Sequence, residues 1–229
     1  MEFPDFRENH HYSSRLKIRA YGSKALAHMD ARHPYETIPL FSVGILLGLW
    51  LVGSHALMLV KSKQVQGWLK KFPRNQQAGQ IILALGMAWF WLLIAPDGLG
   101  KLSALRMDLG DFNNIKPVLQ LLVPATLIAV CISVRDFLAV RALGLLGLMI
   151  SAPLLEAAFL KEPVSRLLVP IFAYALLTKS LFFVGMPYLF RDAITWATAR
   201  SARWNALAFA GVAYGVAVLV CAFAFWRGY

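Results

Sequence analysis

Residues 38–60 read IPLFSVGILLGLWLVGSHALMLV, a run of 23 residues that contains no Lys, Arg, Asp or Glu. As a helix that rises 1.5 Å per residue, this run is about 34 Å long, which is enough to cross the hydrocarbon core of a bilayer. A helix also pairs its own backbone N–H and C=O groups, as the bilayer interior requires. The run therefore predicts a transmembrane helix.

Five further apolar runs follow the first one. They occupy residues 78–95, 118–134, 137–160, 164–190 and 206–226. Together the six runs predict an all-α fold, a polytopic bundle of about six transmembrane helices over residues 38–229.

The overall composition agrees with this fold class. The chain has 229 residues, of which 59% are hydrophobic and 15% are charged, whereas roughly 25% of the residues in a soluble domain are charged. The formal net charge of +11 could attract nucleic acid or anionic lipid, but no nucleic-acid-binding motif is present. We therefore expect the lipid bilayer as a partner and no nucleic acid. Cys131 and Cys221 lie within apolar runs and are expected to be packing residues.

The N-terminal tail, residues 1–37, is polar and basic. Within it, the stretch 12–33 places Ile18, Tyr21 and Met29 at helical spacing, with basic residues elsewhere around the helix. This pattern is typical of a helix lying in the headgroup layer, and a solvated tail with incidental apolar residues is the alternative.

Lys and Arg collect in two connectors, which indicates an orientation. The first connector carries five basic residues and no acid: Lys61, Lys63, Lys70, Lys71 and Arg74. The connector 191–203 is also basic and lies on the same face of a six-span bundle. Because cytoplasmic loops are enriched in Lys and Arg, we expect both termini on the outer face of a bacterial-type inner membrane. The basic residues of the tail argue for the opposite orientation.

Small residues four positions apart mark faces on which helices can pack closely. Three such pairs occur in the first, fourth and last runs: Gly44 with Gly48, Gly147 with Ser151, and Gly211 with Gly215. These faces either pack within the bundle of this chain, which we favour, or contact other subunits.

Lys179 and Glu156 are ionisable residues inside apolar runs. Lys179 lies 15 residues from one end of the run 164–190 and 11 from the other, so we expect it near the midplane of the bilayer. An ionisable residue at that depth suggests a functional role, and a snorkelling side chain is the alternative. Glu156 is expected about 16 Å away in depth, too far for a direct ion pair. An interfacial role for Glu156 beside Lys161 or Arg166 is the simpler interpretation.

His55 is the only histidine inside an apolar run. It could be an axial ligand of a haem or chlorophyll, or a member of a proton relay. Such a histidine more often bonds a backbone carbonyl near the interface. The sequence indicates no other cofactor, and whether a pigment or haem binds stays open.

Two Arg–Asp dipeptides, Arg135–Asp136 and Arg191–Asp192, follow the third and fifth runs and are expected on the same face. Each could be a helix-end ion pair at the membrane surface. Together they could instead form a site for a lipid headgroup.

The sequence contains no phosphate-binding loop, HExxH zinc helix or GxSxG nucleophile motif. We therefore expect a non-catalytic integral subunit of a larger membrane complex, such as an energy-converting assembly, with other membrane subunits or further copies of this chain as partners. One alternative is a small homo-oligomeric transporter or channel with Lys179 on its pathway. A second is an intramembrane lipid-modifying enzyme that uses the two Arg–Asp dipeptides.

Overall fold

The computed structural model describes residues 33–96, 98–134 and 136–229. The predicted interfacial helix at 12–33 lies outside these residues except for His33. Residues Pro34–Tyr229 form one compact unit. Every regular element among the described residues is helical, which confirms the predicted all-α class.

The helices differ in length and role, and their bounds are as follows. The α-helices are α2 (Leu40–Val60), α3 (Ser62–Lys71), α4 (Gln76–Leu93), α5 (Lys116–Ser133), α6 (Leu138–Ala158), α7 (Leu168–Gly185), α8 (Tyr188–Thr198) and α9 (Ser201–Phe225). Short 3₁₀ helices are η1 (Phe72–Arg74), η2 (Gly100–Leu105), η3 (Gly110–Ile115) and η4 (Val164–Leu167).

Five helical segments of the described residues are long and apolar enough to cross a membrane, which indicates an integral membrane protein. They are Leu40–Val60, Gly110–Ser133, Leu138–Ala158, Val164–Gly185 and Ser201–Phe225. The run 78–95 was expected to be a sixth span. It lies largely within α4, which is only 18 residues long and has three glutamines among its first five residues.

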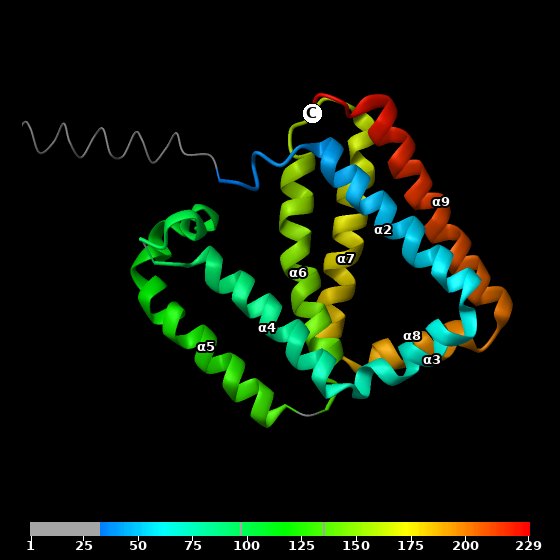
Figure 1. Cartoon of the computed structure of the whole chain (residues 1–229), viewed down its shortest axis with the longest axis horizontal. Helices are drawn as coiled ribbons and strands as arrows, with labels where there is room; N and C mark the ends of the chain where they lie inside the picture. The colour runs from blue at the N-terminus through cyan, green and yellow to red at the C-terminus, as the bar shows by residue number, and fades with distance from the viewer. Residues whose placement is uncertain (1–32, 97, 135) are drawn as a thin grey trace, which may run out of the picture. The chain divides into compact units, whose positions relative to one another are not determined.

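The path of the chain brings its two described ends together. The helices α6 and α7 lie at the centre, α2 and α9 form an antiparallel pair on one side, and α4 and α5 lie on the other (Figure 1). The backbone N–H of Phe41 donates to the carbonyl of Tyr229 over 3.3 Å. The start of α2 and the end of α9 therefore lie at the same end of the unit. At the opposite end, called here the α3–α8 end, these two short helices run across the ends of the longer ones (Figure 1).

The fifth predicted run, 164–190, ends earlier than expected. α7 stops at Gly185, and Met186 adopts φ −129° and ψ 67°, outside the helical region. Pro187 causes this break, because proline disfavours a helical residue before it and cannot donate a backbone hydrogen bond. Tyr188–Thr198 then forms the separate amphipathic helix α8. By contrast, Pro124 and Pro153 lie inside the continuous helices α5 and α6.

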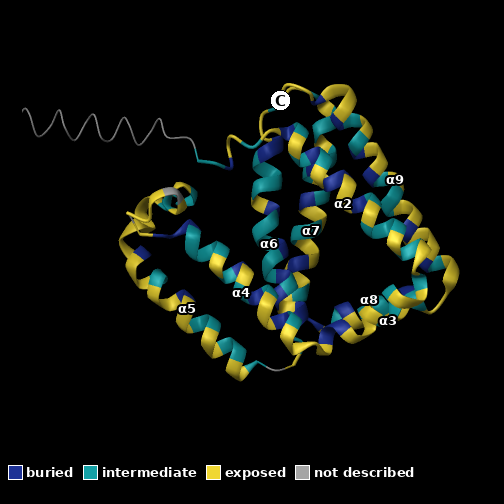
Figure 2. Cartoon of the chain, viewed as in Figure 1, coloured by how far each residue is buried: buried dark blue, intermediate teal, exposed yellow. Residues whose placement is uncertain are grey.

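Burial is concentrated on α6, as the dark residues in Figure 2 show. Within an apolar stretch of 18 residues taken from each span, 39% of the residues of α6 are buried, compared with 11% in the segment that contains α5. On α5, large apolar side chains such as Leu121 and Ile132 are 76% and 66% exposed. Apolar side chains on an outer face are what a lipid-facing helix requires.

The loop 94–115 between α4 and α5 is held by hydrogen bonds to its carbonyl oxygens. The ammonium of Lys116 donates to Met107 O over 2.6 Å, and the amide of Gln120 donates to Ile94 O over 2.7 Å. These contacts fix the start and the middle of the loop to the first turns of α5.

Candidate functional site

Lys179 lies nearer the end of its helix than the apolar run 164–190 indicates. It precedes Gly185, the last residue of α7, by six positions, which corresponds to about 9 Å along a helix. The depth of Lys179 in the membrane stays a prediction, but the expected distance of 11 residues from Lys179 to the end of its span is too long. That distance rested on counting the first residues of α8 as part of the same span.

The side chain of Lys179 is exposed, and no described residue forms a hydrogen bond or ion pair with it. It follows Phe172 by two helical turns, so the two side chains share a side of α7. Phe172 packs edge-on against Trp50 of α2, with ring centroids 6.2 Å apart. Lys179 therefore lies on the side of α7 that faces α2, nearer the α3–α8 end than this aromatic contact.

Glu156 lies toward the other end of the bundle. It is half-buried and stands two residues before Ala158, the end of α6. The structure shows no ion pair between Glu156 and Lys179. It also shows no hydrogen bond or ion pair from Glu156 to Lys161 or Arg166, although all of these residues are described.

His55 packs against a glycine of the partner helix. A Cβ added at Gly211 of α9 would lie 2.0 Å from His55 Cδ2, so the imidazole occupies the space where a side chain would be. Its Nδ1 lies 2.8 Å from the carbonyl oxygen of Leu51. The hydroxyl oxygen of Ser54 lies 3.2 Å from the same nitrogen. Because a carbonyl only accepts, the contact with Leu51 is a hydrogen bond that Nδ1 donates. The role of an axial ligand stays a prediction.

The predicted small-residue pairs lie on helix faces that contact each other within this chain. A Cβ at Gly44 would meet Trp226, and one at Gly48 would meet Leu219. From α9, a Cβ at Gly215 would lie 2.8 Å from Leu51 Cβ. These glycines therefore allow the close approach of α2 and α9.

The same principle joins α6 to α7. A Cβ at Gly147 would lie 2.2 Å from the hydroxyl oxygen of Ser180. Ser151 is fully buried, and its hydroxyl donates to Gly147 O over 2.8 Å. Because the hydroxyl is paired within its own helix, it does not oppose burial between the two helices.

The structure describes three of the four residues in the Arg–Asp dipeptides. Arg135 lies outside the described residues, and Asp136 is exposed just before α6. On α8, Arg191 and Asp192 form an ion pair over 2.9 Å, with 58% and 52% of their side chains exposed. Exposed pairs of this kind contribute little to stability, about 0–1 kcal/mol.

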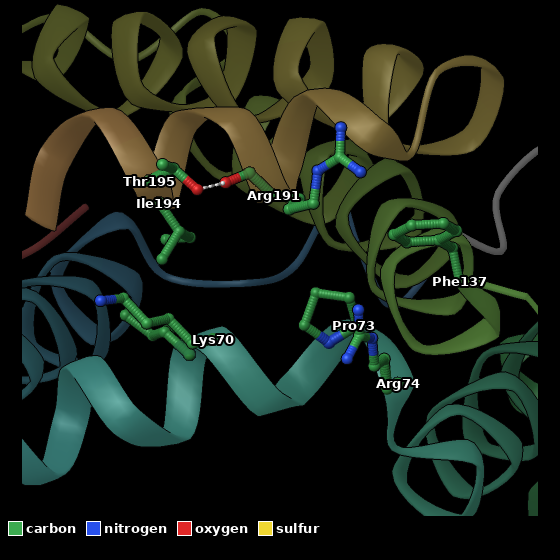
Figure 3. Close-up of a pocket in the computed structure, with 8 residues that line it drawn as sticks. Lys70, Pro73, Arg74, Phe137, Arg191, Ile194 and Thr195 are labelled. Atoms are coloured by element: carbon green, nitrogen blue, oxygen red, sulfur yellow. Dashed lines mark hydrogen bonds between the residues drawn. The ribbon is translucent and has the colours of Figure 1, made fainter.

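A cavity of about 230 Å³ lies at the α3–α8 end (Figure 3). Its lining comes from α3, η1, the residue before α6, and α8. The lining residues are Leu69, Lys70, Pro73, Arg74, Phe137, Arg191, Ile194 and Thr195. Four of them are apolar and three are cations, and none of these described lining residues is an acid.

The charges of this cavity are weakly compensated within the chain. No described residue pairs with Lys70 or Arg74, and Arg191 shares its charge with Asp192 alone. The hydroxyl of Thr195 donates to Arg191 O over 2.8 Å (dashed line in Figure 3). The cavity is thus a positively charged site with apolar walls, suited to an anion that carries an apolar part.

Sequence reasoning found the cations but not the site. Lys70 and Arg74 were interpreted only as indicators of membrane orientation, and Arg191 only as half of a dipeptide. The expected placement of both connectors on one face was the available indication that these residues could meet.

Among the described residues, no group of three or more His, Cys, Asp or Glu side chains could hold a metal ion. Comparison with known protein families, with curated proteins and with solved structures gives no match for this chain.

Proposed function

We propose that this chain is a subunit of a larger membrane assembly, in which the side of α7 that carries Lys179 contacts a transmembrane helix of a different protein. The main support for this proposal is the environment of Lys179. It is an exposed cation on a membrane-spanning helix and has no partner among the described residues. The partner helix supplies a carboxylate to it.

An unpaired charge inside the membrane is energetically unfavourable. Insertion scales assign about 2.5–3.5 kcal/mol to a lysine at the centre of a transmembrane helix. At about 9 Å from the helix end the cost is smaller, because the ammonium can snorkel toward the headgroups. A carboxylate at the same depth offsets what remains and selects one partner over others.

Apolar side chains beside Lys179 provide a surface for helix packing. On α7 and directly after it, Phe182 and Met186, three and seven residues after Lys179, are 46% and 40% exposed. Such exposed side chains can contact either lipid or a helix, and the cation among them favours a helix that carries an acid.

The described spans of a second copy of this chain offer no carboxylate at the depth of Lys179. Ser180, the neighbour of Lys179, contacts Gly147, so Lys179 is level with that residue of α6. Glu156 is nine residues further along α6, about 13 Å away in depth. Asp111, the other acid within the described span windows, also lies toward the end opposite α3 and α8. Copies with the same orientation therefore cannot pair these acids with Lys179.

The test uses synthetic transmembrane peptides as probes in liposomes that contain the labelled protein. One polyleucine peptide carries a single Glu at the depth of Lys179, and its twin carries Gln. We expect the Glu peptide to bind about tenfold more tightly by energy transfer, and Lys179→Met to remove the difference.

Lys63→Met is the matched control, because Lys63 is an exposed lysine of α3 outside the spans. It should leave the preference for the Glu peptide unchanged. Equal binding of both peptides to the unmodified protein, or an undiminished preference in Lys179→Met, would remove the basis of this proposal. Strong energy transfer between two labelled copies would favour a homo-oligomer instead.

Transport along a pathway through Lys179 and lipid modification at the Arg–Asp dipeptides remain predictions. The second retains Arg191 as a residue that lines a cavity.

A further inference from the structure

We infer that the cavity between α3 and α8 binds the phosphate group of an anionic lipid headgroup. This inference is independent of the proposed partner helix, because it concerns other residues. It rests on three properties of the cavity: its charge, its shape and its position relative to the membrane spans.

The charge comes from cations on three separate elements. Lys70 belongs to α3, Arg74 to η1 and Arg191 to α8 (Figure 3). In Figure 3 the ammonium of Lys70 and the guanidinium of Arg191 point away from each other, so they reach one phosphate only after their side chains rotate. The guanidinium groups match phosphate oxygens, since arginine can bind two oxygens at once. None of the described lining residues carries a carboxylate that would repel the anion.

The pair formed by Arg191 and Asp192 does not prevent this binding. Both side chains are more than half exposed, so the pair is weak and exchanges readily with another anion. Arg191 is thus able to turn from Asp192 to a bound phosphate.

The size and walls of the cavity favour a headgroup over a larger ligand. Pockets for drug-sized molecules measure roughly 300–1,000 Å³, whereas this one measures about 230 Å³. Leu69, Pro73, Phe137 and Ile194 supply apolar walls beside the cations. A phosphate next to a glycerol backbone and the start of an acyl chain needs both kinds of surface.

The position places the cavity at headgroup level. α3 begins two residues after the end of α2, and α8 begins three residues after the end of α7. Both short helices are amphipathic and run across the ends of the spans (Figure 1). Helices of this kind lie in the membrane interface, and basic residues there attract anionic lipids.

Specific binding must be separated from general attraction between a basic surface and anionic lipid. Arg74→Gln with Arg191→Gln removes two charges that line the cavity. Lys63→Gln with Arg200→Gln removes two exposed charges from α3 and from the residue before α9, outside the cavity lining. The two double variants therefore have equal net charge and differ only in where the charge is lost.

The experiment measures the binding of dioctanoyl phosphatidic acid to the full chain in a mild neutral detergent. We expect the Kd to rise about tenfold or more in the Arg74, Arg191 double variant. In the control pair we expect less than about a twofold change, since exposed charges outside a site contribute little. Unchanged thermal unfolding of both variants establishes that the fold is retained.

Competition identifies the source of the phosphate. Inorganic phosphate should displace the lipid only at concentrations far above those of glycerol phosphate and of the lipid itself. Displacement by inorganic phosphate at the lipid's own concentrations would overturn the assignment to a lipid. An equal loss of affinity in the two double variants, or no binding of phosphatidic acid to the unmodified chain, would overturn the site.

Discussion

Gly211 shows how one missing side chain determines the packing of two helices. The imidazole of His55 lies over it, and a Cβ at this position would lie 2.0 Å from the ring. We predict that Gly211→Ala forces His55 away from Leu51 O and lowers the free energy of unfolding by about 1–3 kcal/mol, the usual cost of overpacking. Thermal unfolding in detergent measures this change.

Gly53→Ala is the control for this prediction. Gly53 also lies in α2, but a Cβ there would meet nothing within 4 Å. Alanine is the better helix former by about 1 kcal/mol, so this variant should be as stable as the parent or slightly more so. If Gly211→Ala behaves like Gly53→Ala, the contact between His55 and α9 is not tight.

Tyr35 provides a pH-dependent measure of the packing before α2. Its side chain is buried, and burial raises the pKa of its phenol above the usual value, while the hydrogen bond from Trp89 lowers the pKa by a smaller amount. The folded state thus favours the neutral phenol. Its contribution is fully present below about pH 10, the pKa in the unfolded chain, and is lost as the pH rises through the folded pKa.

We therefore predict a loss of thermal stability above about pH 10 that is steeper for the unmodified protein than for Tyr35→Phe. Unfolding temperatures measured from pH 8 to pH 11 test this difference. Parallel curves for the two proteins would mean that Tyr35 ionises as easily in the folded state as in the unfolded state.

At the scale of elements, the loop between α4 and α5 depends on two side chains of α5. Gln120→Leu leaves Ile94 O without its 2.7 Å hydrogen bond, at a cost of about 1–3 kcal/mol for a buried carbonyl. We predict faster cleavage of the loop 94–115 by protease in this variant. Gln77→Leu, an exposed position in the first turn of α4, should leave the cleavage rate unchanged.

The helical elements could be predicted from the sequence more reliably than their ends. Runs of apolar residues located α2, α5, α6 and α9, because hydrophobic length is set by the bilayer. The fifth run, 164–190, predicts a single span, since Tyr188, Leu189 and Phe190 are apolar like the residues before them. Only the backbone break at Met186 and Pro187 separates α7 from α8, and hydrophobicity does not register such a break.

The candidate sites are formed by contacts between helices that are far apart in the sequence, and the sequence alone does not predict such contacts. The small-residue faces were visible in the sequence, but their pairing, Gly48 with α9 and Gly147 with α7, required the arrangement of the helices. Likewise, Arg74 and Arg191 are 117 positions apart and line one cavity only because α3 and α8 lie side by side.

At the scale of the whole molecule, the positions of the start of α2 and of Tyr229 bear on whether the chain crosses the membrane an even or an odd number of times. The start of α2 and Tyr229 are joined by a hydrogen bond and lie at the same end of the unit, so we predict an even number of membrane crossings between them. Since five described segments qualify as spans by length and composition, this prediction requires α4 to be a sixth crossing. The polar glutamines of its first turn then lie at headgroup level.

This topology predicts which positions share a membrane face. Cysteines at Glu36 and Arg227 should react with an impermeant maleimide from one side, and a cysteine at Gly67 of α3 from the other, in a chain with Cys131 and Cys221 replaced. The basic α3–α8 end should be cytoplasmic, because Lys and Arg are retained there. Labelling of Glu36 and Arg227 from opposite sides would contradict the even number of crossings.

The central claim is that α7 crosses the membrane and ends at Gly185, while α8 lies in the interface. Spin labels placed singly at residues 174–198 in liposomes measure this most directly, through their relative accessibility to oxygen and to a nickel complex. We predict a steady change in depth as far as residue 185, followed by an oscillation of helical period about a constant shallow depth over Tyr188–Thr198. A depth that keeps changing steadily through residue 190, or full exposure of all positions to the nickel complex, would contradict the account.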